Sequence, residues 1–180
     1  MGSRPREPPP HNSKRTESGS SYENEYFGIH YDLPEGWTFE DDATLAESNS
    51  QSDAIASDTS IDMVAYSPDK SGTVTIGIEG ATEYNAGQSA EEHLANQVKE
   101  MVESAEGDNV SYLSETATLT FDGSDTSIPA TATTLTVNGN ELHVLNAVLE
   151  NEGNFLSFVV QAPSEEEANA AAAGLRLILE

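Results

Sequence analysis

His30 and Asp32 are the first residues of this sequence whose types and spacing suggest chemistry. In residues 27–33 (FGIHYDL) apolar and polar residues alternate, which is the period of a half-buried β-strand. His30 and Asp32 then share the polar face, where they would suit a metal site or an acid–base pair. A zinc site and a catalytic triad each need a third group, however. We therefore predict a solvated strand face.

The other candidate groups are scattered along the chain. His11, His93 and His143 fall in three different segments, and none has a second histidine at metal-ligand spacing. We predict that each lies on the surface or at a rim. The oxygen-rich turns at 40–42, 122–125 and 151–152 do not follow the spacing of a twelve-residue calcium loop. We interpret them as solvated turns.

The motifs that mark common reactions are missing from the sequence. It contains no G-x-G-x-x-G, Walker loop, H-E-x-x-H or G-x-S-x-G. It also has no cysteine, which excludes disulfides, thiolate chemistry and cysteine-based zinc sites. We therefore predict no catalytic, cofactor-binding or metal-binding residues, no cofactor, and a protein that is not an enzyme.

The charge of the chain is strongly negative and unevenly distributed. The chain has seven basic and 32 acidic residues, which give a net charge of −25. Four of the seven basic residues lie before residue 16. Such a surface repels phosphate backbones and anionic lipid heads, which excludes nucleic-acid binding by the folded part. The acidity would attract cations or a basic partner, or it reflects an acid-biased proteome.

The first 21 residues are predicted to stand apart from the fold. They are rich in Pro, Ser and Arg and have no apolar side chain between Met1 and Tyr22, so we predict a disordered or polyproline-like tether, or a vector-derived remnant. Residues 22–180 are long enough for one domain with a sizeable core. No run of about 18 apolar residues occurs that could span a bilayer.

Two helices and a series of strands are predicted from hydrophobic periodicity. Helices are expected over 89–105 and from Ser164 onward, because each has a capping box and an apolar stripe. The second stripe comprises Ala168, Ala171, Ala172, Leu175, Ile178 and Leu179. A hairpin is expected over 60–80, and a short helix and a loop over 41–58.

Four further strands are expected between the two helices. They cover 109–121, 127–137, 141–150 and 155–162, and Asn138-Gly139 is a strong hairpin turn signal. The last two strands carry apolar residues on both faces, so they must be covered on both sides. We therefore predict an α/β sandwich, of the α+β type, with a central antiparallel meander of six to seven strands and helices on both faces.

The segment that follows the first strand carries a resemblance. Residues 33–36 (LPEG) suit a type I turn with Pro34 in the second position, and Trp37 is interpreted as a packing anchor. This Pro34, Gly36 and Trp37 pattern and the order of elements over 24–180 resemble the small secreted PsbP-like lipoproteins of Gram-positive bacteria. On this basis FGIHYDLPEGW is a signature of the fold and not a catalytic site.

The resemblance implies a location and a mode of action. Its members are lipidated at an N-terminal cysteine, which this sequence lacks, so membrane association is expected only through an anchor absent from this chain. An extracytoplasmic, monomeric domain that contacts an unknown protein partner is expected, with a binding surface on a sheet edge or helix face. The alternative is a small-ligand or calcium-binding protein, which needs a pocket or a carboxylate cluster assembled from distant turns.

Overall fold

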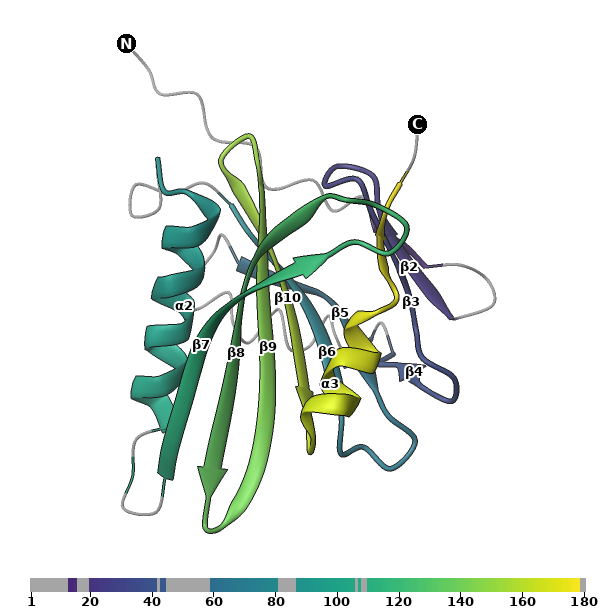
Figure 1. Cartoon of the computed structure of the whole chain (residues 1–180). Coiled ribbons are helices and arrows are strands. Elements are labelled where there is room, and N and C mark those ends of the chain that lie inside the picture. Colours follow the sequence, from purple (N-terminus) through teal and green to yellow (C-terminus); the bar gives the residue numbers. More distant parts are fainter. Residues whose placement is uncertain are drawn as a thin grey trace.

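The computed structural model of the chain describes residues 13–15, 20–41, 43–44, 59–80, 87–105, 107 and 110–178. They build two antiparallel sheets with helices α2 (Ala90–Ala105) and α3 (Glu165–Ala172) (Figure 1). None of the described helices is long and apolar enough to cross a membrane.

The larger sheet has seven strands in the order β4-β5-β6-β10-β9-β8-β7. These are β4 (Thr38–Phe39), β5 (Thr59–Tyr66), β6 (Thr73–Glu79), β7 (Val110–Thr120), β8 (Ser127–Val137), β9 (Asn140–Asn151) and β10 (Asn154–Ala162). The predicted β5–β6 hairpin and the meander from β7 to β10 are confirmed. Asn138 and Gly139 have φ of 52° and 83°, and this positive φ at both positions is what a type I′ hairpin turn requires.

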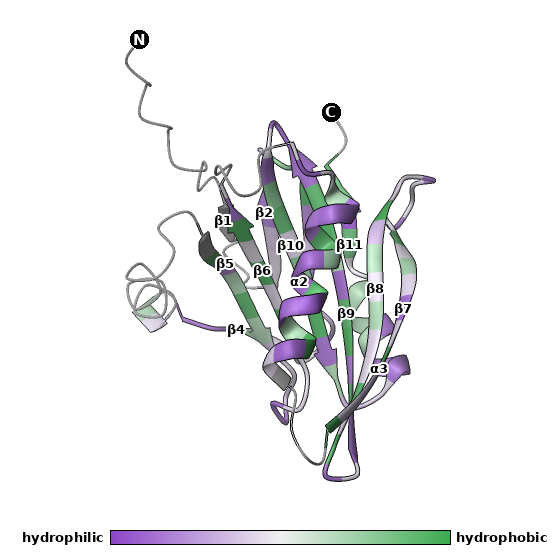
Figure 2. Ribbon diagram, turned by 90° about the vertical axis from the view of Figure 1, so that its left-hand side faces the viewer, coloured by the Kyte–Doolittle hydropathy of each residue, from purple (hydrophilic) through white to green (hydrophobic). Residues whose placement is uncertain are grey.

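Helix α2 covers one face of the larger sheet. Its Leu94 packs on Val148 of β9 and Phe155 of β10 in a small buried cluster, and Figure 2 shows the helix lying in front of the sheet. The predicted capping box is present, because Ser89 Oγ accepts a hydrogen bond from Glu92 N at 3.2 Å and Glu92 Oε2 accepts one from Ser89 N at 2.8 Å.

The opposite face is covered by a second sheet together with α3. This sheet has the order β1-β2-β3-β11, with β1 (Ser13–Arg15), β2 (Ser21–Asn24), β3 (Ile29–Asp32) and β11 (Leu175–Leu177). Tyr31 of β3 meets Phe158 of β10 edge to face, with ring centroids 5.2 Å apart, and donates a hydrogen bond to the carbonyl of Ala171 in α3 at 2.7 Å. The main core therefore lies between the two sheets.

The second sheet corrects the predicted arrangement of one sheet between helices. The last helix ends at Ala172, and Leu175, predicted to continue the helical stripe, begins β11. At Gly174 the chain passes so close to β3 that a Cβ would overlap the carbonyl oxygen of Asp32, while Asp32 N donates to Gly174 O at 3.1 Å. Strand pairing with β3 thus replaces the helix that the periodicity predicts.

Two further predictions for the opening stretch are corrected. The first strand is shorter than 27–33, because Phe27 and Gly28 belong to the turn between β2 and β3, where Gly28 has φ of 68°. The next turn lies one residue later than predicted. Trp37 N donates to Pro34 O at 3.1 Å and Gly36 has φ of 83°, which are features of a type II turn.

Part of the predicted tether forms structure. Residues 13–15 pair as β1 with β2, in the register Ser13↔Asn24 and Arg15↔Tyr22. Residues 1–12 and 16–19, and most of the short helix and loop predicted over 41–58, lie outside the described residues.

The close approach at Gly174 gives a prediction about stability. Gly174→Ala should lower the free energy of unfolding by about 2 kcal/mol or more, because the added methyl group must push the β3 backbone away. Gly107→Ala is the matched control, since a Cβ there meets only Val110 Cγ2 at 3.7 Å. Urea unfolding measures both. Equal midpoints for the two variants would contradict this packing of β11 on β3.

Candidate binding sites

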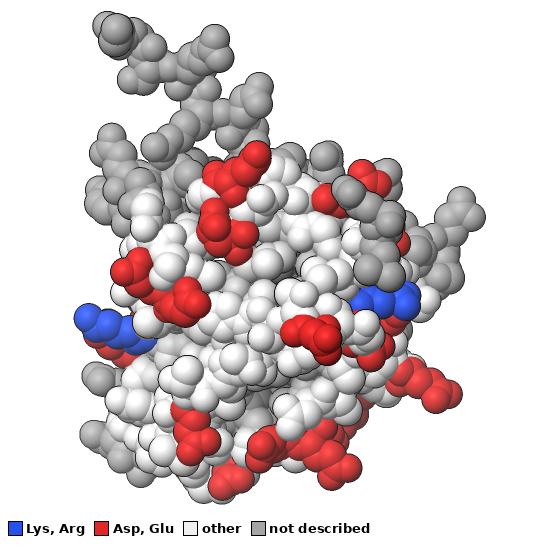
Figure 3. All heavy atoms as spheres, turned by 45° about the horizontal axis from the view of Figure 1, so that its top comes forward, with Lys and Arg blue, Asp and Glu red and all other residues white. Residues whose placement is uncertain are grey.

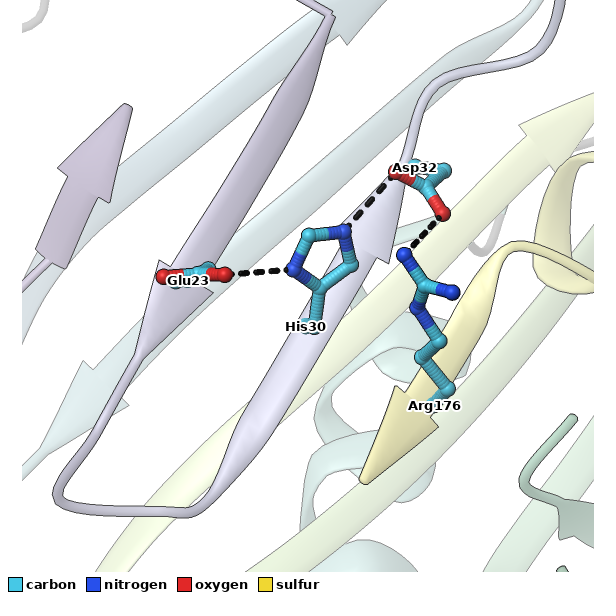
Figure 4. Close-up of polar contacts among 4 residues, drawn as sticks. All are labelled: Glu23, His30, Asp32 and Arg176. Carbon is cyan, nitrogen blue, oxygen red and sulfur yellow. Dashed lines mark hydrogen bonds and ion pairs between the residues drawn. The ribbon is translucent and has the colours of Figure 1, made fainter. Parts of the chain in front are cut away.

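His30 lies in a row of charged side chains across the smaller sheet (Figure 4). Its Nδ1 is 2.8 Å from Glu23 Oε1 on β2, and its Nε2 is 2.8 Å from Asp32 Oδ1. Asp32 Oδ2 in turn meets the guanidinium of Arg176 on β11 at 2.9 Å. The carboxylates therefore bind opposite sides of the imidazole ring and do not converge on a common point.

This row makes neither a metal site nor a catalytic triad. Among the described residues no three His, Asp or Glu side chains are placed to hold a metal ion. The face predicted to be solvated is only partly exposed. The side chain of Asp32 is 49% accessible, whereas that of His30 is 13% accessible. Its polar groups pair with each other across three strands, so the row is best understood as a link that fixes the register of β2, β3 and β11.

His93 corrects the prediction that the histidines lie on the surface or at rims. It is 4% exposed, and its ring stacks on Phe155 with centroids 4.0 Å apart. Its Nε2 lies 3.1 Å from Glu79 Oε2, and Gln97 one turn further along α2 donates to Ser157 Oγ at 2.7 Å. His93 is one residue from the apolar stripe of α2, close enough to be buried with Leu94. His143 is half-buried, and His11 lies outside the described residues.

Two of the predicted oxygen-rich turns hold acceptor oxygens that bond within the protein. Asp41 accepts hydrogen bonds from the backbone N–H and the hydroxyl of Thr44, both at 2.8 Å, and these bonds lower the pKa of the Asp41 carboxyl. Tyr26 donates to Glu152 Oε2 at 3.2 Å in the turn between β9 and β10. Such bonds are typical of structural turns.

A cavity of about 390 Å³ lies where three distant segments meet. We call it the Trp37 cavity. Its wall is formed by the turn after β3, the turn between β5 and β6, the end of β10 with Pro163, and one side of α3. The lining is largely apolar and includes Trp37, the three prolines Pro34, Pro68 and Pro163, and alanines of α3. Asp69 and Glu167 supply its two carboxylates.

Trp37 has a structural role and also lines this cavity. The indole packs over Gly72, where a Cβ would lie 2.9 Å from the ring atom Cη2, so only glycine leaves it room. Trp37 also packs at the margin of the main core and is only partly buried. The prediction that Trp37 is a packing anchor is therefore correct for the part of the indole that packs on Gly72. It does not account for the cavity that Trp37 also lines.

Asp69 is held in place by its own turn. Its Oδ1 accepts hydrogen bonds from Ser67 Oγ at 2.8 Å, from Ser71 Oγ at 2.7 Å and from Ser71 N at 3.0 Å. These bonds, those of Ser71 above all, lower the pKa of Asp69 to about 2. The cavity therefore carries a fixed negative charge at neutral pH.

Strand β7 is the second candidate site, because it forms an end of the larger sheet. Tyr112 is 55% exposed and Leu113 is 64% exposed, and the strand contains one charged residue, Glu115, and no proline. Within the described residues β7 pairs with β8 alone, so its other side offers backbone N–H and C=O groups. We call residues 110–120 the β7 edge.

Comparison with solved structures identifies the fold as PsbP-like. The cyanobacterial PsbP protein CyanoP from Synechocystis sp. PCC 6803 is 14% identical, with a TM-score of 0.55 over 87% of this chain and 91% of that chain. The Ran-binding protein Mog1p from Saccharomyces cerevisiae is 10% identical, with a TM-score of 0.45 over 93% and 96% of the two chains. At these identities the likeness concerns the fold alone.

A third structure, of a protein from Bacteroides thetaiotaomicron, is 13% identical, with a TM-score of 0.43 over 85% of this chain and 46% of that chain. No family model and no curated protein matches the sequence. The candidate sites therefore have to be judged on their own geometry.

The hydrogen bonds of Asp69 give a prediction about pH. The carboxyl group should titrate at about 2 in the folded protein. Since this value lies below the ordinary one of 3.8, the stability contributed by the charged form is present above pH 4 and is lost as the pH falls towards 2. Ser71→Ala should move the titration back towards 3.8, as followed by carbon-13 NMR of the carboxyl group. An unchanged midpoint in Ser71→Ala would show that Ser71 does not hold this charge.

Proposed function

We propose that this chain is a non-enzymatic interaction domain that binds an extended segment of a partner protein along the β7 edge. The observation that carries the proposal is the combination, in one eleven-residue edge strand, of open backbone groups and two exposed large apolar side chains. An extended peptide can add to such an edge as a further strand, with main-chain hydrogen bonds supplying affinity and side chains supplying selectivity.

Tyr112 and Leu113 would contact an added strand on its two faces, because successive side chains of a strand point to opposite sides of the sheet. Tyr112 and Leu113 both border a hollow that they share with Thr134 and His143. An added strand could therefore place an apolar side chain in this hollow. A solitary exposed leucine needs no explanation, but two adjacent exposed apolar residues on an open edge strand favour a binding surface.

The charge of the chain favours a different protein over a second copy as the occupant. Two chains that each carry −25 repel each other, whereas a basic segment is attracted. Acidic side chains spread over the face drawn in Figure 3, and basic ones are sparse there. We therefore propose a monomer whose partner presents a basic or neutral extended segment.

We assign no catalytic role to the described residues. Both nitrogens of the His30 ring contact carboxylates, and the ring of His93, on the buried side of α2, stacks on Phe155. General acid–base catalysis needs a titrating group within reach of a bound substrate. Neither histidine lines the Trp37 cavity, and in the polar cavity that His93 does line, the Glu79 carboxylate already contacts its Nε2.

We further propose that the protein acts outside the cytoplasm. The support is the resemblance of residues 24–180 to PsbP-like lipoproteins and the polar composition of residues 1–12, ahead of β1, which suits a tether. Fractionation of the source cells with an antibody against the domain tests this: recovery in the envelope or the medium is expected, and recovery in the cytoplasm alone contradicts it.

Strand addition can be tested with a blocked peptide of alternating valine and threonine that carries lysine at both ends. It should shift the amide NMR signals of residues 110–120 and slow their hydrogen exchange, because the open side of β7 becomes hydrogen-bonded. The same peptide with glutamate at both ends should bind more weakly, since the domain is acidic.

Side-chain variants separate strand addition from general attraction. Tyr112→Thr and Leu113→Thr should each weaken binding of the lysine peptide about two- to fivefold, the size of one cross-strand side-chain contact. Ile178→Thr alters an exposed apolar residue away from β7 and serves as the control. The proposal would be contradicted if the peptide shifted amide signals away from β7 instead of those of residues 110–120. Equal affinity of Tyr112→Thr, Leu113→Thr and Ile178→Thr for the lysine peptide would also contradict it.

A further inference from the structure

The Trp37 cavity has the composition of a site for an organic cation. Its volume of about 390 Å³ is within the range of small-ligand sites, and its wall is mostly Trp, Pro and Ala. Asp69 and Glu167 are the acidic residues of this lining, and no basic residue belongs to it. A positive group on an apolar stem matches both properties, because the stem contacts the wall while the charge meets the carboxylates.

A metal ion fits the cavity poorly. Calcium takes six to eight oxygen ligands, and zinc takes four ligands drawn from nitrogen, sulfur and carboxylate oxygen. The described residues contain no group of three His, Asp or Glu that could hold a metal ion, and the cavity has two carboxylates. Trp37 offers an aromatic ring, which attracts organic cations through its π-face.

The two carboxylates can receive a ligand without giving up their structural bonds. The three hydrogen bonds of Asp69 all reach Oδ1, and Oδ2 accepts none of them. At Glu167 the backbone N–H caps α3 by donating to Ser164 Oγ at 3.2 Å, so the exposed side chain is not needed for the cap. Lys70, in the same turn as Asp69, forms no ion pair with either acid in the described part of the chain.

We propose that the Trp37 cavity binds an arginine side chain presented by a partner protein, with the guanidinium against Trp37 and its N–H groups directed to Asp69 and Glu167. Arginine suits this arrangement better than lysine, because its planar group stacks on aromatic rings and offers five donors to two separate carboxylates. The site is independent of the β7 edge and goes beyond the proposed function, since it lies on the other side of α3, against β5, β6 and the turn after β3.

The fluorescence of Trp37 provides a local test, because it is the only tryptophan of the chain. The probe is the blocked peptide acetyl-Gly-Arg-Gly-amide, and its control is the same peptide with citrulline, which keeps the shape of arginine and removes the charge. The arginine peptide should change the Trp37 emission in a saturable way. The citrulline peptide should bind at least about tenfold more weakly.

Substitutions in the protein locate the site. The double variant Asp69→Asn, Glu167→Gln should weaken binding of the arginine peptide about tenfold, because both carboxylate charges are removed while shape is kept. Glu166→Gln is the matched control, because it removes one charge from the neighbouring position of α3 outside the cavity lining. It should leave the affinity unchanged.

Several results would overturn the inference. Equal binding of the citrulline peptide would mean that charge is not recognised, and an equal loss in Glu166→Gln would mean general attraction to an acidic surface. Calcium chloride alone producing the same emission change, with a higher melting temperature, would identify a metal site instead. Failure of the arginine peptide leaves the lysine-peptide test of the β7 edge unaffected, so the two proposals stand or fall separately.

Discussion

The burial of strands β9 and β10 on both faces is the constraint on which the rest of the structure depends. Val148 and Phe155 point to one side of the larger sheet, and Ala147 and Phe158 point to the other. Strands that are apolar on both faces must be covered on both faces. Helix α2 is sufficient for the first side. On the second side the N-terminal hairpin β2–β3, helix α3 and the returning strand β11 together provide the cover.

The return of the chain at its C-terminal end also explains where the Trp37 cavity lies. Because β11 pairs with β3, helix α3 is held beside the end of β3 and the turn that follows it. The β5–β6 turn reaches the same place through the packing of Gly72 against Trp37. The cavity therefore arises where the elements that close the core meet, and its shape depends on the close approach at Gly174 as well as on the residues that line it.

Local sequence signals predicted the elements whose structure is local. The capping box at Ser89, the Asn138-Gly139 turn and the alternation in β6 each depend on residues within a few positions of one another, and the structure agrees. Residues 175–177 were predicted to be helical because their apolar spacing continues that of α3. They form a strand because β3, far away in the sequence, supplies a better partner.

For the candidate sites too, the sequence predicts local elements but not how distant segments come together. Alternating apolar and threonine residues predicted a strand over 109–121, but the position of β7 at the end of the sheet depends on the order of all seven strands. The Trp37 cavity could not be predicted, because its carboxylates at Asp69 and Glu167 are almost a hundred residues apart in the sequence. For His93, the helical pattern gave the correct element but not the depth to which the ring is buried.

The turn after β3, the β5–β6 turn and α3 converge around Trp37. Nuclear Overhauser contacts of the indole ring in the free protein test this convergence most directly. Contacts are expected between the indole protons at Cη2 and Cζ2 and the α-protons of Gly72. An indole with random-coil chemical shifts and no contact to Gly72 would show that the three segments do not meet.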